Sequence, residues 1–66
     1  MDYTNSRIRE LIAEYVHNER NRKLLERRLI DGITFEKLAE EFELSVSQVK
    51  RIIMKESETL FRHVPE

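Results

Sequence analysis

The chain has 66 residues, with 12 Lys or Arg against 13 Asp or Glu, a formal net charge of -1 at pH 7, and no cysteine. A chain of this length forms a single domain, here residues 1–66, and buries only about 60% of the surface that its unfolded form exposes, which is too little for most enzymes of independent fold. Disulfides and thiolate metal sites are excluded, and we expect no catalytic activity, cofactor, metal or small-molecule substrate.

The first predicted helix covers residues 5–17 and follows a short frayed start. Asn5 or Ser6 can cap its N-terminus, because both side chains accept a hydrogen bond from a backbone N–H of the first turn. Apolar residues recur at helical spacing, so we expect this helix to form a core-facing lid over the domain. His17 has no partner at metal-ligand spacing, and we interpret it, like His63, as a surface or boundary residue. The apolar side consists of Ile8, Leu11, Ile12, Tyr15 and Val16.

A second helix is predicted over residues 19–31. Asn18 is placed to cap it, and Gly32 is placed to end it because glycine readily adopts the left-handed conformation that closes helices. Two explanations remain open for its basic side chains, namely a solvated face or contacts with phosphates or a partner protein. Arg27 and Arg28 are the candidates for phosphate contacts. The residues that we expect to be buried are Leu24, Leu25, Leu29 and Ile30.

A third, short helix is predicted over residues 35–42. Thr34 is placed to cap it, with Ile33 and Leu38 spaced to close a hydrophobic staple over that cap. Ala39 suits a close crossing of two helix backbones, which a bulkier residue would push apart. The apolar positions are Phe35, Leu38, Ala39 and Phe42.

The fourth predicted helix covers residues 46–63, and Pro65 marks its limit. Ser45 and Gln48 form an S-x-x-Q capping box at its start. Because only residues 43–45 separate it from the preceding helix, the chain must turn sharply, as in a helix-turn-helix. We therefore expect an all-α fold, a compact bundle of about four helices that ends in a helix-turn-helix. The core side of this helix consists of Val49, Ile52, Ile53 and Leu60, with Leu44 and Val49 spaced as a staple.

The segment DGITFEKLAEEFELSVSQVKRI, residues 31–52, resembles region four of the housekeeping bacterial sigma factors, the C-terminal domain of the promoter-recognition subunit of RNA polymerase. Sigma-like members tolerate an acidic residue at the position of Glu43, where many helix-turn-helix regulators have glycine because positive φ is often needed. The resemblance implies a helix-turn-helix that binds double-stranded DNA, with the β-flap region of RNA polymerase as a partner. It is carried by Asp31-Gly32, Leu38-Ala39, Phe42, Glu43, Leu44-Ser45, Val49 and Ile52, and extends with lower specificity through residues 18–30.

A step of 100° per residue from Val49, at the centre of the buried side, defines the outward side of the last helix. A helix in a major groove reads bases with its N-terminal turns, so residues 46–55 are the expected recognition helix. Lys and Arg suit O6 and N7 of guanine, and Val can contact a thymine methyl group. The outward residues are Ser47, Lys50, Arg51, Met54 and Glu58. The expected base-reading residues are Val46, Ser47, Lys50 and Arg51, and the expected phosphate contacts are Ser45, Lys55, Arg27 and Arg28.

Met54 and Phe61 fall away from the expected core. Two interpretations remain open for them: a surface for self-association or for a partner protein, or packing of the helix end against the first helix.

Our leading hypothesis is a DNA-binding transcriptional regulator or sigma-like factor, either a dimer or delivered to DNA by RNA polymerase. The alternative is a protein-interaction adaptor that binds polymerase or another regulator, or a helical homodimer, without binding DNA. Nothing resembles the promoter-melting part of a sigma factor, so we expect a stand-alone protein, as from a phage or mobile element. No apolar run approaches a membrane span and no signal peptide precedes the helices, so we expect a cytoplasmic protein with no membrane contact.

Overall fold

The computed structural model describes residues 4–62, which form four helices and no strand. The all-α fold that the sequence predicts is confirmed. The helices are α1 (Asn5–Tyr15), α2 (Glu19–Leu29), α3 (Phe35–Phe42) and α4 (Val46–Arg62).

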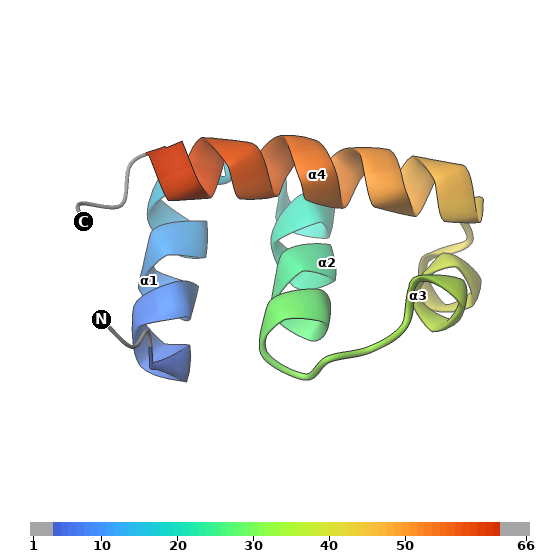
Figure 1. The fold of residues 1–66 in the computed structure, drawn as a ribbon, viewed down its shortest axis with the longest axis horizontal. Coiled ribbons are helices and arrows are strands. Elements are labelled where there is room, and N and C mark those ends of the chain that lie inside the picture. The colour runs from blue at the N-terminus through green and yellow to red at the C-terminus, as the bar shows by residue number, and fades with distance from the viewer. Residues whose placement is uncertain (1–3, 63–66) are drawn as a thin grey trace.

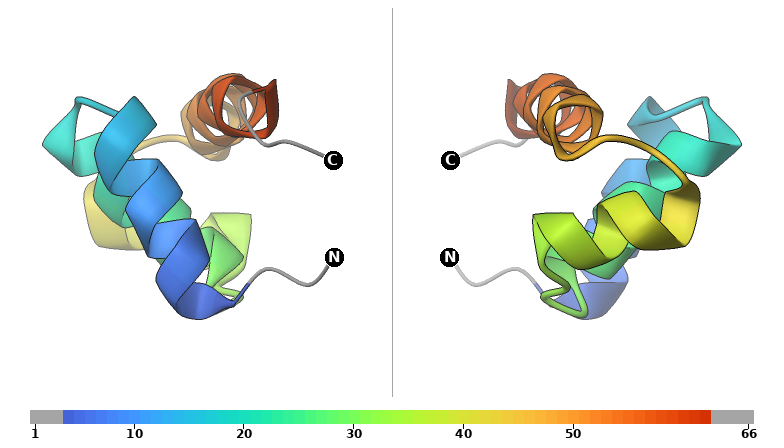
Figure 2. Two further views of the ribbon diagram at one scale, coloured as in Figure 1. Left: turned by 90° about the vertical axis from the view of Figure 1, so that its left-hand side faces the viewer. Right: turned by 90° about the vertical axis from the view of Figure 1, so that its right-hand side faces the viewer.

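The long helix α4 runs across the other three helices (Figure 1). α1 and α2 lie side by side and antiparallel, and the C-terminal part of α4 passes over α1 while its N-terminal part meets α3. In the right-hand view of Figure 2, α3 runs across the picture while α4 is seen end-on, so these two helices cross. This crossing produces the helix-turn-helix arrangement.

The core lies between α4 and the three shorter helices, and every helix contributes to it. Ala39 is 7% exposed, which agrees with the small residue expected where α3 meets α4. Leu29, Phe35, Phe42 and Ile52 are partly buried and pack against the core, while Ile30 is half-buried. Over the described residues, no helix combines the length and the apolar character needed to cross a bilayer. The buried residues are Leu11, Ile12, Val16, Leu24, Leu25, Leu38, Ala39, Val49, Ile53 and Leu60.

The predicted caps of α2 and α3 are confirmed. The Asn18 side chain accepts a hydrogen bond from the backbone N–H of Asn21 at 3.1 Å. Thr34 accepts one from the backbone N–H of Lys37 at 3.2 Å. Each cap satisfies an N–H group that has no partner inside its helix, so both starts are fixed by local sequence.

The prediction of Asn5 or Ser6 as the cap of α1 is wrong, because Thr4 is the cap. Thr4 has an extended backbone (φ -74°, ψ 160°), and its Oγ1 accepts a hydrogen bond from the N–H of Arg7 at 3.1 Å. All three residues are good caps, but the earlier start adds the hydrogen bond from the N–H of Ile8 to the Thr4 carbonyl, at 3.0 Å.

The predicted ends of α1 and α2, at residues 17 and 31, lie two residues too late. Val16 is already extended, and the Arg22 guanidinium donates hydrogen bonds to the carbonyls of Val16 and Ala13, which the end of α1 leaves unpaired. After α2 the chain turns through Gly32, whose φ of 70° is the left-handed conformation expected for it. α4 is described to Arg62, so the predicted end at residue 63 and the assignments of His63 and Pro65 lie outside the described residues.

Candidate nucleic-acid interface

The corner between α3 and α4 is made by one residue in the left-handed conformation. Glu43 has φ 56° and ψ 46°, and among the described non-glycine residues it alone has positive φ. The N–H of Leu44 then donates to the carbonyl of Ala39 at 2.9 Å, which closes the end of α3. The half-buried Leu44 packs against the core and fixes the direction in which the chain enters α4.

The predicted capping box at the start of α4 is confirmed. The N–H of Gln48 donates to Ser45 Oγ at 3.1 Å, and the N–H of Ser45 donates to Gln48 Oε1 at 2.9 Å. The Gln48 amide is therefore occupied, as expected. No acidic residue lies in the first turn of α4, so the partial positive charge of the helix N-terminus is not offset there.

Three of the four expected base-reading residues project from the first turns of α4. Ser47, Lys50 and Arg51 are exposed, and we call them the reading face. Val46 is half-buried and packs against the core, so it is the least available of the four. Ser45 and Lys55, two of the expected phosphate contacts, are also exposed. In the sequence, Ser45 precedes the reading face and Lys55 follows it.

The ring of Phe35 links the reading face to α2. The Arg28 guanidinium carbon lies 4.3 Å from the ring centroid and Lys50 Nζ lies 5.8 Å from it, both within the range of cation–π attraction. Arg28 also donates a hydrogen bond to the carbonyl of Ile33 at 3.0 Å. The structure therefore brings Arg28 and Lys50, from different helices, against the same aromatic ring.

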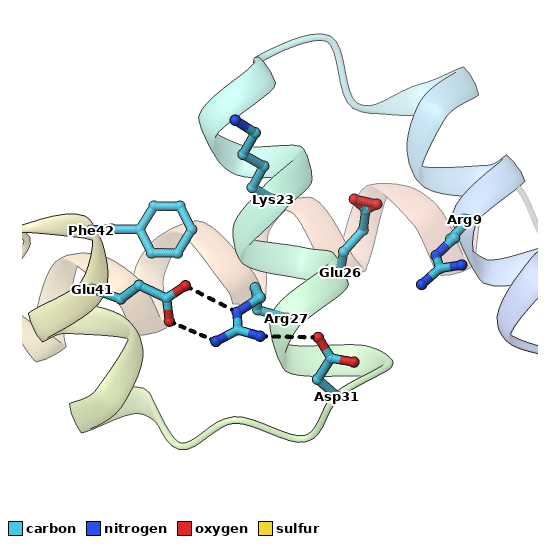
Figure 3. A pocket seen from close by; sticks show the side chains of 7 residues that line it. All are labelled: Arg9, Lys23, Glu26, Arg27, Asp31, Glu41 and Phe42. Atoms are coloured by element: carbon cyan, nitrogen blue, oxygen red, sulfur yellow. Dashed lines mark hydrogen bonds and ion pairs between the residues drawn. The ribbon is translucent and has the colours of Figure 1, made fainter.

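Arg27 points to another side of the molecule. Its Nε and Nη2 both donate to the Glu41 carboxylate at 3.0 Å, and its Nη1 lies 3.3 Å from Asp31 Oδ2 (Figure 3). The hydrogen bond to Glu41 and the charge of Glu41 raise the pKa of Arg27 above its ordinary value, with smaller contributions from Asp31. Its charge is thus neutralised within the domain, although its assignment as a phosphate contact stays a prediction.

A shallow hollow of about 220 Å³ lies beside Arg27 and is lined by residues of α1, α2 and α3 and by Asp31. Arg9 of α1 and Lys23 of α2 are among its lining residues, on the side of α2 opposite to α4 (Figure 3). The hollow is therefore separate from the reading face, and its cations and carboxylates are mixed.

Met54 and Phe61 are 71% and 55% exposed, respectively. The far end of α4 does pack against the core, but through Leu60, which is 2% exposed. The end of α4 thus packs on α1, as one interpretation expected, but the side chains of Met54 and Phe61 remain exposed within the domain. Their role as a partner surface stays a prediction.

The sequence did not reveal the role of Phe35 or the partner of Arg27. Phe35 was expected only as one of the apolar positions of α3, and Glu41 was assigned no contact. Neither contact follows a spacing rule, because each joins residues of different helices.

Within the described part of the chain, no group of three or more His, Asp or Glu side chains is arranged to hold a metal ion. The chain matched no family model, no curated protein and no solved structure in our comparisons.

Proposed function

We propose that the protein is a DNA-binding transcriptional regulator, sigma-like in its docking mode, that inserts the start of α4 into the major groove and acts in the cytoplasm. The observation that carries this proposal is the exposure of Ser47, Lys50 and Arg51 on the first turns of a helix that follows a sharp left-handed corner. N-terminal turns of a second helix are the part that a helix-turn-helix presents to base edges.

The roles of the side chains follow from their chemistry. Lys50 and Arg51 can each donate to O6 and N7 of guanine, and Ser47 can pair with several bases. Lys55, one turn further along α4, is better suited to a phosphate. Ser45 and the uncompensated N-terminus of α4 would face the backbone of the duplex, since helix N-termini attract phosphate.

A single domain would bind DNA weakly. On random-sequence DNA, where Lys50 and Arg51 have no matched guanine, these two residues can contact phosphates as Lys55 does. Three neutralised phosphates give a slope of log K against log salt of about -3, well short of that of proteins that contact six to ten phosphates. Tight binding would require two half-sites about 34 Å apart, or delivery by RNA polymerase.

The test is a titration of random-sequence duplex DNA with the protein at low and then moderate salt. We expect binding at low salt that weakens with a slope near -3, and its loss in the double variant Lys50→Ala/Arg51→Ala. Absence of binding at low salt would refute the proposal.

The matched control is Arg9→Ala/Lys23→Ala, which removes two positive charges from the side opposite to α4 (Figure 3). This variant should bind DNA within about twofold of the parent, because the duplex would not contact that side. An equal loss in both double variants would mean that net charge, and not α4, determines binding.

The adaptor hypothesis has one observation in its favour. Glu36, Glu40 and Glu43 are exposed, and within the described residues none of their carboxylates has a hydrogen bond or ion pair. An acidic surface of this kind can attract a basic surface patch on a partner protein. Retention by RNA polymerase without DNA, lost in Glu36→Gln/Glu40→Gln, would support it.

A further inference from the structure

One side of α4 carries an exposed row of residues at heptad-like spacing. All residues of this row are exposed, and the Nζ of its lysine, Lys50, also lies 5.8 Å from the centroid of the Phe35 ring on α3. Met54, in the middle, is 71% exposed, and Phe61, two turns further, is 55% exposed. We call this row the α4 outer row. It consists of Ser47, Lys50, Met54, Glu58 and Phe61.

The α4 outer row has charges and side-chain sizes that complement those of the same row read in the opposite direction. Lys50 and Glu58 lie four residues before and after Met54, and they carry opposite charges. Ser47 and Phe61 lie seven residues before and after it, and one is small where the other is large. A second α4 running antiparallel, with a two-fold axis at Met54, would therefore place each residue opposite its complement.

We propose that the outer row binds a second copy of this chain through such an antiparallel α4 pair. Met54 contacts Met54 of the other copy at the axis, each Lys50 pairs with the opposite Glu58, and each Phe61 covers the opposite Ser47. A two-fold interface repeats every contact, so the charge pair and the apolar contact each occur twice. We infer a second copy of the same chain as the partner because the charges and side-chain sizes of the row complement those of the same row in reverse order, and not because the row is exposed.

The dimer is expected to be weak. Two apolar side chains per copy give an interface below the usual size of stable complexes. Glu58 already has an ion pair with Arg62 at 3.0 Å, which remains compatible with a second cation because a carboxylate has two oxygens that accept.

The dimer also covers Ser47 and Lys50 of the reading face. If the proposed DNA function holds, on which this consequence rests, the dimer and the DNA complex compete for one side of α4. Self-association would then keep the protein off DNA at high concentration, because only the monomer presents the reading face.

A cysteine cross-link tests the axis, and the absence of native cysteine makes the test clean. Met54→Cys should form a disulfide-linked dimer under mild oxidation, since the two sulfurs meet at the axis. Phe61→Cys is the matched control, because the two Phe61 positions would lie about 21 Å apart, seven residues of 1.5 Å on each side of the axis. Equal cross-linking of both variants, or none in Met54→Cys, would overturn the proposed pairing.

A charge swap followed by sedimentation tests the register. Lys50→Glu and Glu58→Lys alone each place like charges opposite one another and should weaken the dimer by about tenfold, while the combined variant should restore it to within about threefold of the parent. Glu14→Lys on α1, with the same change in net charge as Glu58→Lys, should leave the dimer unchanged. Failure of the combined variant to recover would refute the register.

The two proposals fail separately. The combined Lys50→Glu/Glu58→Lys variant should dimerise but lose DNA binding, whereas Glu58→Lys should dimerise poorly and keep DNA binding. If both single variants still dimerise while Lys50→Ala/Arg51→Ala abolishes DNA binding, the dimer alone is refuted. If the combined variant recovers the dimer but the parent protein does not bind DNA, the DNA function alone is refuted.

Discussion

At residue 43 the chain adopts a conformation that L side chains disfavour. The Glu43 carboxylate is exposed and makes no hydrogen bond or ion pair within the described residues, so no contact of this side chain offsets the cost. The left-handed conformation costs a non-glycine residue about 1–2 kcal/mol. The corner that aims α4 is thus imposed by packing on both sides of it, chiefly by Ala39 and Leu44.

We expect Glu43→Gly to stabilise the domain by about 0.5–1 kcal/mol, because relief of the left-handed strain exceeds the extra entropy that glycine gives the unfolded chain. In a domain of this size that corresponds to a rise in Tm of about 3–8 °C, measured by circular dichroism during heating.

Glu40→Gly is the matched control, since Glu40 is an exposed residue inside α3. There glycine should destabilise by about 0.5–1 kcal/mol, because no strain is relieved and helix propensity is lost. The same sign of Tm change in both variants would contradict the account of the corner.

At the scale of the element, α4 begins with hydrogen bonds that its own sequence supplies. Ser45 and Gln48 satisfy each other's backbone N–H groups, so the start of the helix does not depend on a neighbouring element. The position of the first turn determines the direction of Ser47, Lys50 and Arg51. A frayed start would therefore disorder the reading face before it unfolded the domain.

Ser45→Ala should destabilise the domain by about 1 kcal/mol, because the N–H of Gln48 loses its acceptor. Ser47→Ala, two residues further and inside the helix, should be neutral or slightly stabilising, since alanine has the higher helix propensity. Urea denaturation of the two variants gives both values, and an equal cost would show that the box contributes nothing.

The contact between Arg27 and Glu41 joins α2 to α3 across 14 residues of sequence. Both side chains are more than a third exposed, so water and salt screen the pair. A double-mutant cycle with Arg27→Met and Glu41→Gln should give a small coupling at low salt that vanishes at high salt. Because the Glu41 and Asp31 carboxylates raise the pKa of Arg27 above its ordinary value, the guanidinium stays charged throughout the neutral range and its titration adds no pH dependence there. A coupling that does not depend on salt would contradict an electrostatic origin.

At the scale of the whole molecule, stability depends on a small core that α4 shares with every other helix. At about 0.05–0.15 kcal/mol per residue, the free energy of unfolding is about 3–10 kcal/mol, so one core cavity removes much of it. Leu60 and Phe61 are neighbours in the sequence, but Leu60 is buried in this core and Phe61 is exposed.

Leu60→Ala should destabilise the domain by about 2–4 kcal/mol, because a cavity remains where α4 meets the core. Phe61→Ala should change the stability of the dilute monomer by no more than about 0.5 kcal/mol. Thermal unfolding at low concentration measures both. If Phe61→Ala lowered the free energy of unfolding as much as Leu60→Ala, Phe61 could not be an exposed residue of the α4 outer row.

Features that depend on short-range chemistry could be predicted from the amino-acid sequence. The caps at Asn18, Thr34 and Ser45 and the apolar spacing of four helices follow from hydrogen bonds and side-chain directions within one or two turns, so they could be predicted and were confirmed. The cap of α1 could not be predicted, because Thr4, Asn5 and Ser6 can all cap a helix and the intrinsic preference favours Asn and Ser over the Thr4 that the structure uses.

Which charged side chains remain available to a ligand depends on how the helices pack together. Arg27 and Arg28 are similar in the sequence, yet the fold pairs one with Glu41 and places the other against Phe35, because α3 packs against α2 and brings a different residue to each arginine. Lys50 and Arg51 stay exposed because the crossing of α3 and α4 turns their side of the helix outward. Local sequence determines where each helix begins, but the packing of helices distant in sequence determines which side chains reach solvent.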